Sequence, residues 1–146
     1  MRFMLIVKAS KDSEAGAMPS AGLIAAMGKF NEEMAKAGVL LAADGLQASS
    51  KGARVKFSKG KRTVVDGPFA ETKELIAGFW LIQVKSREEA IEWAKRSPAP
   101  HETEDCEIEV RQIFEVADFP ADVLPPDFAA REKAIRGELH KNAGKR

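Results

Sequence analysis

Hydrophobic and polar positions form blocks along the chain, and these blocks predict strands and helices in turn. Residues 3–7 and 78–84 are apolar at nearly every position, which is typical of strands that are covered on both faces. Further strands are predicted at 39–46, where Asp44-Gly45 suggests a bulge or bend, and at 106–116, where apolar and polar residues alternate. The polar stretch 10–19, rich in small residues, predicts a loop.

Two helices lie between these strands. The first is predicted at 21–37, because Ser20 can cap its start, Gly38 can end it in a left-handed conformation, and one apolar stripe contains Leu23, Met27, Phe30 and Met34. The second begins at a capping box formed by Ser86 and Glu89 and continues to Lys95.

A hairpin is predicted between residues 53–58 and 62–65, with Lys59-Gly60 as its turn. The element order is then strand, helix, strand, hairpin, strand, helix, strand. Two split βαβ halves on a mostly antiparallel sheet predict an α+β, ferredoxin-like fold.

The hairpin carries six basic side chains, and these predict a solvated edge hairpin that resists aggregation: Lys51, Arg54, Lys56, Lys59, Lys61 and Arg62. The alternative is a nucleic-acid contact. Lys plus Arg number 23 against 22 Asp plus Glu, so the net charge of +1 gives no general attraction to nucleic acid or anionic lipid. We therefore expect no nucleic-acid or membrane partner.

The central strands present apolar side chains on both faces, with Met4 and Ile6 opposite Leu5, and Phe79 opposite Trp80. Two helices cover only one face of a four-stranded sheet, and a bare apolar face is not tolerated on a soluble monomer. Either the C-terminal helix or a second subunit must cover it. We favour a twofold homodimer, whose shared interior would leave pockets for a small-molecule ligand.

The 146 residues predict one main domain at 1–118 and a C-terminal helical extension at 119–146. A charged segment, 128–141, predicts a helix that packs on the domain or on a partner. The single cysteine, Cys106, excludes an internal disulfide, and the first apolar run is too short for a signal peptide or membrane span. We expect a cytoplasmic protein.

The run from Val65 to Glu74, followed by Gly78-Phe79-Trp80, resembles the signature of the DGPF-domain proteins in the YCII-related family. The resemblance covers roughly residues 1–116 and implies a dimeric α+β barrel. It implies no settled reaction: some relatives are fused or genetically linked to transcription sigma factors, and others resemble small lyases and dehalogenases. A His–Asp pair is a suggested active site in the wider family.

Asp66 and His101 are the candidate catalytic residues. Gly67 and Pro68 would hold the Asp66 carboxylate on a rigid turn, as suits a general base or a cation ligand. The loop between the second helix and the last strand must bring His101 near it, where Asp66 would orient the imidazole as a general base. In the structural interpretation, Asp66 closes its own turn and His101 is an exposed loop histidine beside an acidic run.

Candidate substrate contacts follow the same turn. Glu71 and Lys73 lie just beyond it, where they reach a pocket rim or form a solvated segment. Phe69 is a pocket wall or part of the core, and Trp80 lies on the strand that follows. The chain has no metal-ligand spacing, phosphate loop or nucleophile elbow, so we expect no metal and no cofactor.

These features favour a homodimer that binds a small organic molecule near Asp66. Its enzymatic form would be cofactor-free acid–base catalysis of a lyase, isomerase or hydrolase type. The alternatives are a non-catalytic binding or regulatory module linked to sigma factors, and a structural dimer without a pocket.

Overall fold

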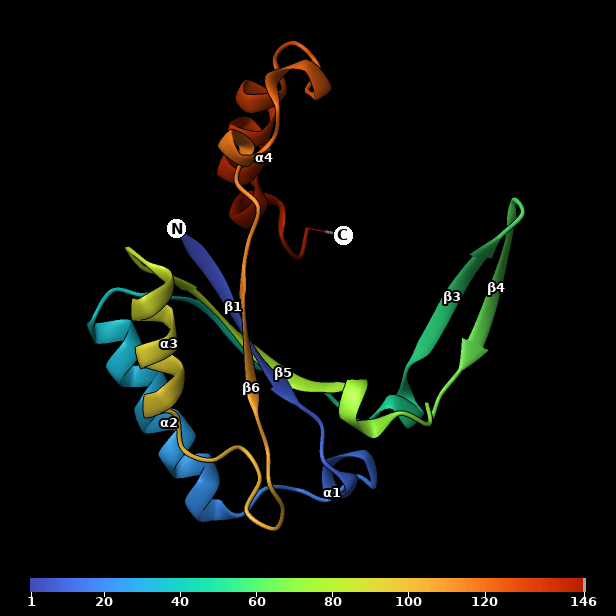
Figure 1. The fold of residues 1–146 in the computed structure, drawn as a ribbon, viewed down its shortest axis with the longest axis vertical. Coiled ribbons are helices and arrows are strands. Elements are labelled where there is room, and N and C mark those ends of the chain that lie inside the picture. Colours follow the sequence, from blue (N-terminus) through green and yellow to red (C-terminus); the bar gives the residue numbers. More distant parts are fainter. Residues whose placement is uncertain (146) are drawn as a thin grey trace. The chain divides into compact units, whose positions relative to one another are not determined.

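A computed structural model describes residues 1–145 and has the predicted order of strands and helices (Figure 1). The order β2–β5–β1–β6 defines an antiparallel four-stranded sheet built from β1 (Arg2–Lys8), β2 (Leu40–Gly45), β5 (Ile76–Gln83) and β6 (Ile108–Gln112). This is the order of a ferredoxin-like sheet, so the predicted α+β fold is confirmed. The last strand is shorter than the predicted 106–116.

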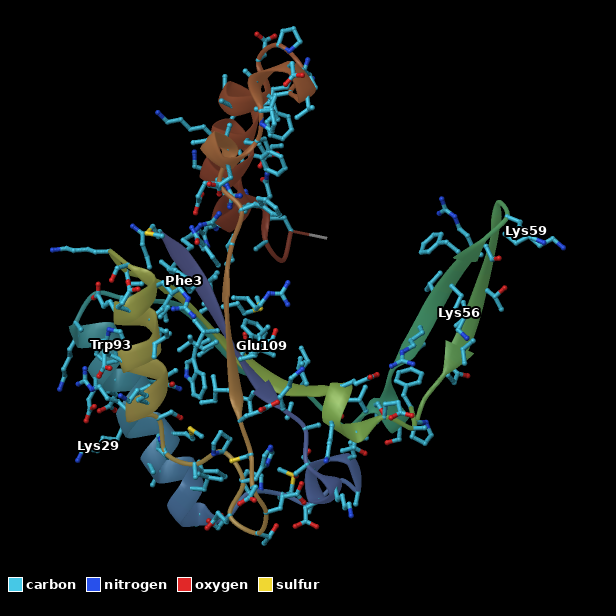
Figure 2. All side chains as sticks on the ribbon, viewed as in Figure 1. Phe3, Lys29, Lys56, Lys59, Trp93 and Glu109 are labelled. Carbon is cyan, nitrogen blue, oxygen red and sulfur yellow. The ribbon has the colours of Figure 1, made fainter. Side chains whose placement is uncertain are left out.

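Helices α2 (Ala21–Lys36) and α3 (Arg87–Arg96) lie on the same face of this sheet (Figure 1). The core between the two layers includes Phe3 and Trp93, which are labelled in Figure 2. The Phe30 ring meets the Trp80 ring edge to face, with centroids 5.4 Å apart. Buried and half-buried side chains alternate along β1. The half-buried ones lie on the face of the sheet that α2 and α3 do not cover.

The predicted helix ends are confirmed with one change. The Ser20 hydroxyl accepts from the Leu23 N–H, and Gly38 follows the helix with φ +75°. The Ser86 hydroxyl accepts from the Glu89 N–H, but the Glu89 carboxylate accepts from the Lys85 N–H rather than from Ser86.

The predicted loop at 10–19 contains one helical turn, α1 (Lys11–Glu14). A helix this short has no hydrophobic periodicity by which the sequence could reveal it. Ser10 and Ser13 exchange capping hydrogen bonds at its start. Because Ser10 is almost fully buried, this capping box fixes α1 directly after β1.

The hairpin of β3 (Ala53–Ser58) and β4 (Lys61–Asp66) forms a separate two-stranded sheet. Every one of its strand residues is exposed. The expectation of an edge hairpin is wrong, because β2 and β6 occupy the two edges of the four-stranded sheet. Figure 2 labels Lys56 and, at the tip, Lys59.

The chain divides into two compact units, Met1–Ile113 and a second unit from Phe114 onward. The second unit contains α4 (Phe128–Asn142), as predicted, and the stacked rings of Phe114 and Phe119. No residue of α4 is buried. None of the described helices is long and apolar enough to cross a bilayer. The domain division at residue 118 stays a prediction.

Candidate functional site

A cavity of about 950 Å³ opens at one end of the four-stranded sheet in the first unit. Its floor is the end of β1, the end of β2 and the start of β5, and one wall is the first part of α2, with Leu23, Ile24 and Met27. The loops on either side of α1 and the loop that contains His101 complete it. A space of this size at the end of a sheet is typical of small-molecule sites.

His101 lines this cavity and is held by the backbone. Its Nε2 atom lies 2.6 Å from the Lys8 carbonyl oxygen, and a carbonyl only accepts, so Nε2 carries a hydrogen and donates it. In the neutral ring Nδ1 is then the acceptor. This imidazole is half-buried, and among the described residues it forms no other side-chain hydrogen bond.

Asn31 supplies a hydrogen-bond donor to the same cavity, whereas His101 supplies an acceptor. The Trp80 indole Nε1–H donates to the Asn31 Oδ1 atom at 2.7 Å. Because an indole N–H only donates, the amide must present its oxygen to Trp80. The Asn31 NH₂ group therefore keeps both of its donors for another partner. No sequence pattern singled out Asn31, which follows Phe30 and lies off the predicted apolar stripe of its helix.

Apolar side chains form most of the cavity walls, among them Met18, Leu23, Ile24, Met27 and Trp80. The charged lining residues are the three acids Asp12, Asp44 and Glu102 and one base, Lys51. Two of these carboxylates are held in place: Asp12 accepts from the Thr103 hydroxyl, and Glu102 accepts from the Ser20 hydroxyl.

The turn of residues 66–69 is packed against the adjacent short helix, η1 (Ser49–Lys51). A Cβ atom on Gly67 would lie only 1.8 Å from the Ser49 carbonyl oxygen, so no side chain fits at this position. The Gly67–Pro68 peptide bond is cis. This close contact gives the glycine of the motif a structural reason.

Ser49 joins this turn to α1. Its hydroxyl donates to the Glu14 carboxylate and accepts from the Phe69 N–H at 3.0 Å. The Phe69 ring lies under the Arg54 guanidinium, 3.8 Å from ring centroid to carbon. Ala48 and Ser50, on either side of Ser49, line the cavity, whereas residues 66–69 do not.

The structure thus places the predicted site residues in two groups. His101 and Trp80 line the cavity, whereas Asp66, Glu71 and Lys73 are exposed and Phe69 is half-buried beside Arg54. Among the described residues, no hydrogen bond joins Asp66 to His101. Their pairing stays a prediction, as do the substrate contacts. Residues 1–145 contain no cluster of three metal-ligating side chains.

The family model of the YCII-related domain matches residues 1–117, which include the cavity, His101 and the 66–69 turn. The chain belongs to the YCII-related family. An uncharacterised protein of Rhizobium meliloti (strain 1021) is 35% identical over 77 residues. Because that relative is uncharacterised, the similarity assigns no activity to this YCII-related chain. The match covers 52% of this chain and 62% of that relative, so the chain spans less than two thirds of its length.

Proposed function

We propose that this YCII-related chain is a cytoplasmic homodimer of the DGPF-domain type that binds a small organic molecule in the cavity beside His101. Acid–base catalysis on that molecule, without a cofactor, is part of the proposal. The observation that carries it is a largely apolar cavity containing one imidazole whose orientation is fixed by Lys8.

The proposed chemistry follows from the atoms that remain available. The Lys8 carbonyl holds Nε2–H, so Nδ1 is the atom that would take a proton from the ligand. The carboxylate of Asp66 would then stabilise the imidazolium once that proton has arrived. Phe69, Glu71 and Lys73 remain proposed contacts at the turn.

Two apolar surfaces support the homodimer. On the helix-free face of the sheet, Met4, Ile6 and Leu81 are only half-buried. The hairpin register places Val55 opposite Val64, and Phe57 lies on the same face. These three side chains are 52–70% exposed, and a two-stranded hairpin alone is marginally stable in water. A second copy would cover such surfaces.

Filling the cavity tests the binding proposal. Gly28 lines the cavity from α2, and a Cβ atom there would meet nothing within 4 Å. The probe is N-phenyl-1-naphthylamine, an uncharged dye that fluoresces in apolar surroundings. We expect Gly28→Trp to weaken dye binding by about tenfold or more, because the indole occupies the space that the dye needs.

Gly28→Ala is the matched control. It removes the same glycine but adds one methyl group, so it should keep dye binding and raise the stability of α2 by about 0.5–1 kcal/mol. Equal dye binding by the wild type and both variants would contradict the cavity as the binding site.

A further inference from the structure

Two polar groups in the cavity have complementary hydrogen-bonding roles that the protein itself fixes. Trp80 holds Asn31 so that its NH₂ group is left to donate, and Lys8 holds His101 so that Nδ1 is left to accept. Neither group forms a further side-chain hydrogen bond among the described residues. A ligand that satisfies both must carry an acceptor and a donor.

The charge of the lining adds a second restriction. Two carboxylates, of Asp12 and Glu102, stand against the single ammonium of Lys51 on the helix side of the sheet, whereas Asp44 pairs with Phe79 and points to the other face. No ion pair joins Asp12, Glu102 or Lys51 to another described residue. Carboxylates at the rim repel a bound carboxylate, and because these side chains are exposed, solvent screening keeps the effect modest.

The walls add a third restriction. Met27 and Trp80 present apolar and aromatic surface to the same space, which favours a flat apolar body over a sugar or a polyol.

From these three restrictions we propose that the cavity selects uncharged aromatic or similarly flat molecules that carry both a hydroxyl and a carbonyl group. The hydroxyl donates to His101 Nδ1, and the carbonyl oxygen accepts from the Asn31 NH₂ group. This inference rests on the proposed function, since it names the ligand class of the same cavity. It also identifies the proton that His101 would receive, which is the hydroxyl proton of the ligand.

Four matched probes test it by displacement of N-phenyl-1-naphthylamine, at a pH where the phenols are neutral. 4-Hydroxyacetophenone carries both groups, 4-methoxyacetophenone lacks the donor, 4-ethylphenol lacks the carbonyl, and 4-hydroxybenzoate is an anion. We expect 4-hydroxyacetophenone to bind about tenfold more tightly than each of the other three. Two of them lack one hydrogen bond to the cavity, and the third carries a charge that the rim carboxylates repel.

Two variants separate the roles of the polar groups. His101→Leu should abolish the preference for hydroxyl over methoxy while the preference for carbonyl over ethyl remains. Asn31→Asp keeps an acceptor for Trp80 but removes the NH₂ donors, so it should abolish the preference for the carbonyl. Asp12→Asn should improve binding of 4-hydroxybenzoate a few-fold and leave the uncharged probes unchanged, and Asp44→Asn, on the other face of the sheet, is its control and should change neither.

The outcomes separate the inference from the proposal on which it rests. If the dye binds but the four probes displace it equally, or the anion displaces it best, the ligand class is wrong and the cavity remains a binding site. If the dye does not bind the wild type at all, both the binding site and the ligand class are wrong.

Discussion

At the scale of single residues, the turn at 66–69 shows why a short motif needs its glycine. The Gly67 Cα atom is pressed against the backbone of Ser49, while the Gly67 N–H donates to the Gly52 carbonyl at 3.0 Å. Both contacts involve backbone atoms, which cannot move aside as a flexible side chain can. The motif is therefore explained in part by packing, independently of any chemistry at Asp66.

Gly67→Ala should lower the free energy of unfolding by about 1–3 kcal/mol, because the added methyl group must displace the backbone of Ser49. Urea unfolding measures the loss, and the amide resonance of Phe69 reports whether its hydrogen bond to Ser49 survives. Gly52→Ala is the control, since a Cβ atom there would lie at an ordinary 3.5 Å from the Ser49 oxygen. Equal losses in the two variants would contradict this explanation.

The proposed pairing of Asp66 with His101 is also tested at the residue scale. The chain has two histidines, so ¹⁵N spectra of the imidazole rings are simple to assign. Asp66→Asn should change the ring ¹⁵N resonances of His101 and leave those of His140 unchanged, because a nearby carboxylate alters the ring's protonation and hydrogen bonding. Glu71→Gln is the control for loss of a carboxylate near the turn. Unchanged His101 resonances in Asp66→Asn would remove Asp66 from the site.

At the scale of elements, α2 forms both the core layer and one wall of the cavity. Phe30 and Met34 are buried in the core, and Asn31 and Met27 line the cavity. The start of the helix is tied to the loop that contains His101, because the Ser20 hydroxyl donates to the Glu102 carboxylate at 2.6 Å. The helix cap thus also positions the cavity rim.

Ser20→Ala should cost about 1 kcal/mol of stability, since it removes the acceptor for the Leu23 N–H at the start of the helix. Thermal and urea unfolding measure this loss, and dye binding should weaken because the Glu102 contact is lost as well. Ser20→Thr keeps the hydroxyl and should restore most of both properties. A threonine variant as unstable as the alanine variant would contradict the capping role.

The sequence was informative for elements with strong periodicity and less so elsewhere. The apolar stripe and Gly38 predicted α2 to within one residue of its end, and the caps Ser20 and Ser86 are confirmed. The turn of α1 and the position of the hairpin outside the main sheet were missed. A four-residue helix has no measurable period, and strand pairing depends on contacts between distant segments.

At the scale of the whole molecule, the helix-free sheet face decides whether one copy is sufficient. Leu81 pairs with Met4 across β5 and β1, and Ile6 is the next apolar side chain on that face. Charged neighbours frame it, because Lys8 and Arg111 both contact Glu109, which is labelled in Figure 2. An apolar centre with a charged rim is the usual composition of a protein interface.

Leu81→Glu should convert the proposed homodimer to a monomer, because association would bury an unpaired carboxylate. Sedimentation velocity measures the mass, and circular dichroism checks that the variant is folded. Lys29→Glu, on the exposed side of α2 (Figure 2), is the control and should leave the mass unchanged. A wild-type protein that sediments as a monomer at all concentrations would refute the homodimer.

The amino-acid sequence by itself determined the order of the main strands and helices, the caps at Ser20 and Ser86 and the family, because these depend on local periodicity and on short motifs. The ferredoxin-like fold followed from that order. Only the tertiary structure decided which side chains share a cavity. Asn31 and His101 are 70 positions apart, and each is oriented by a partner on a different strand, Trp80 on β5 and Lys8 on β1. Hydrogen bonds between such distant segments leave no periodic trace in the chain, so the cavity's donor and acceptor could be recognised only after folding brought them together.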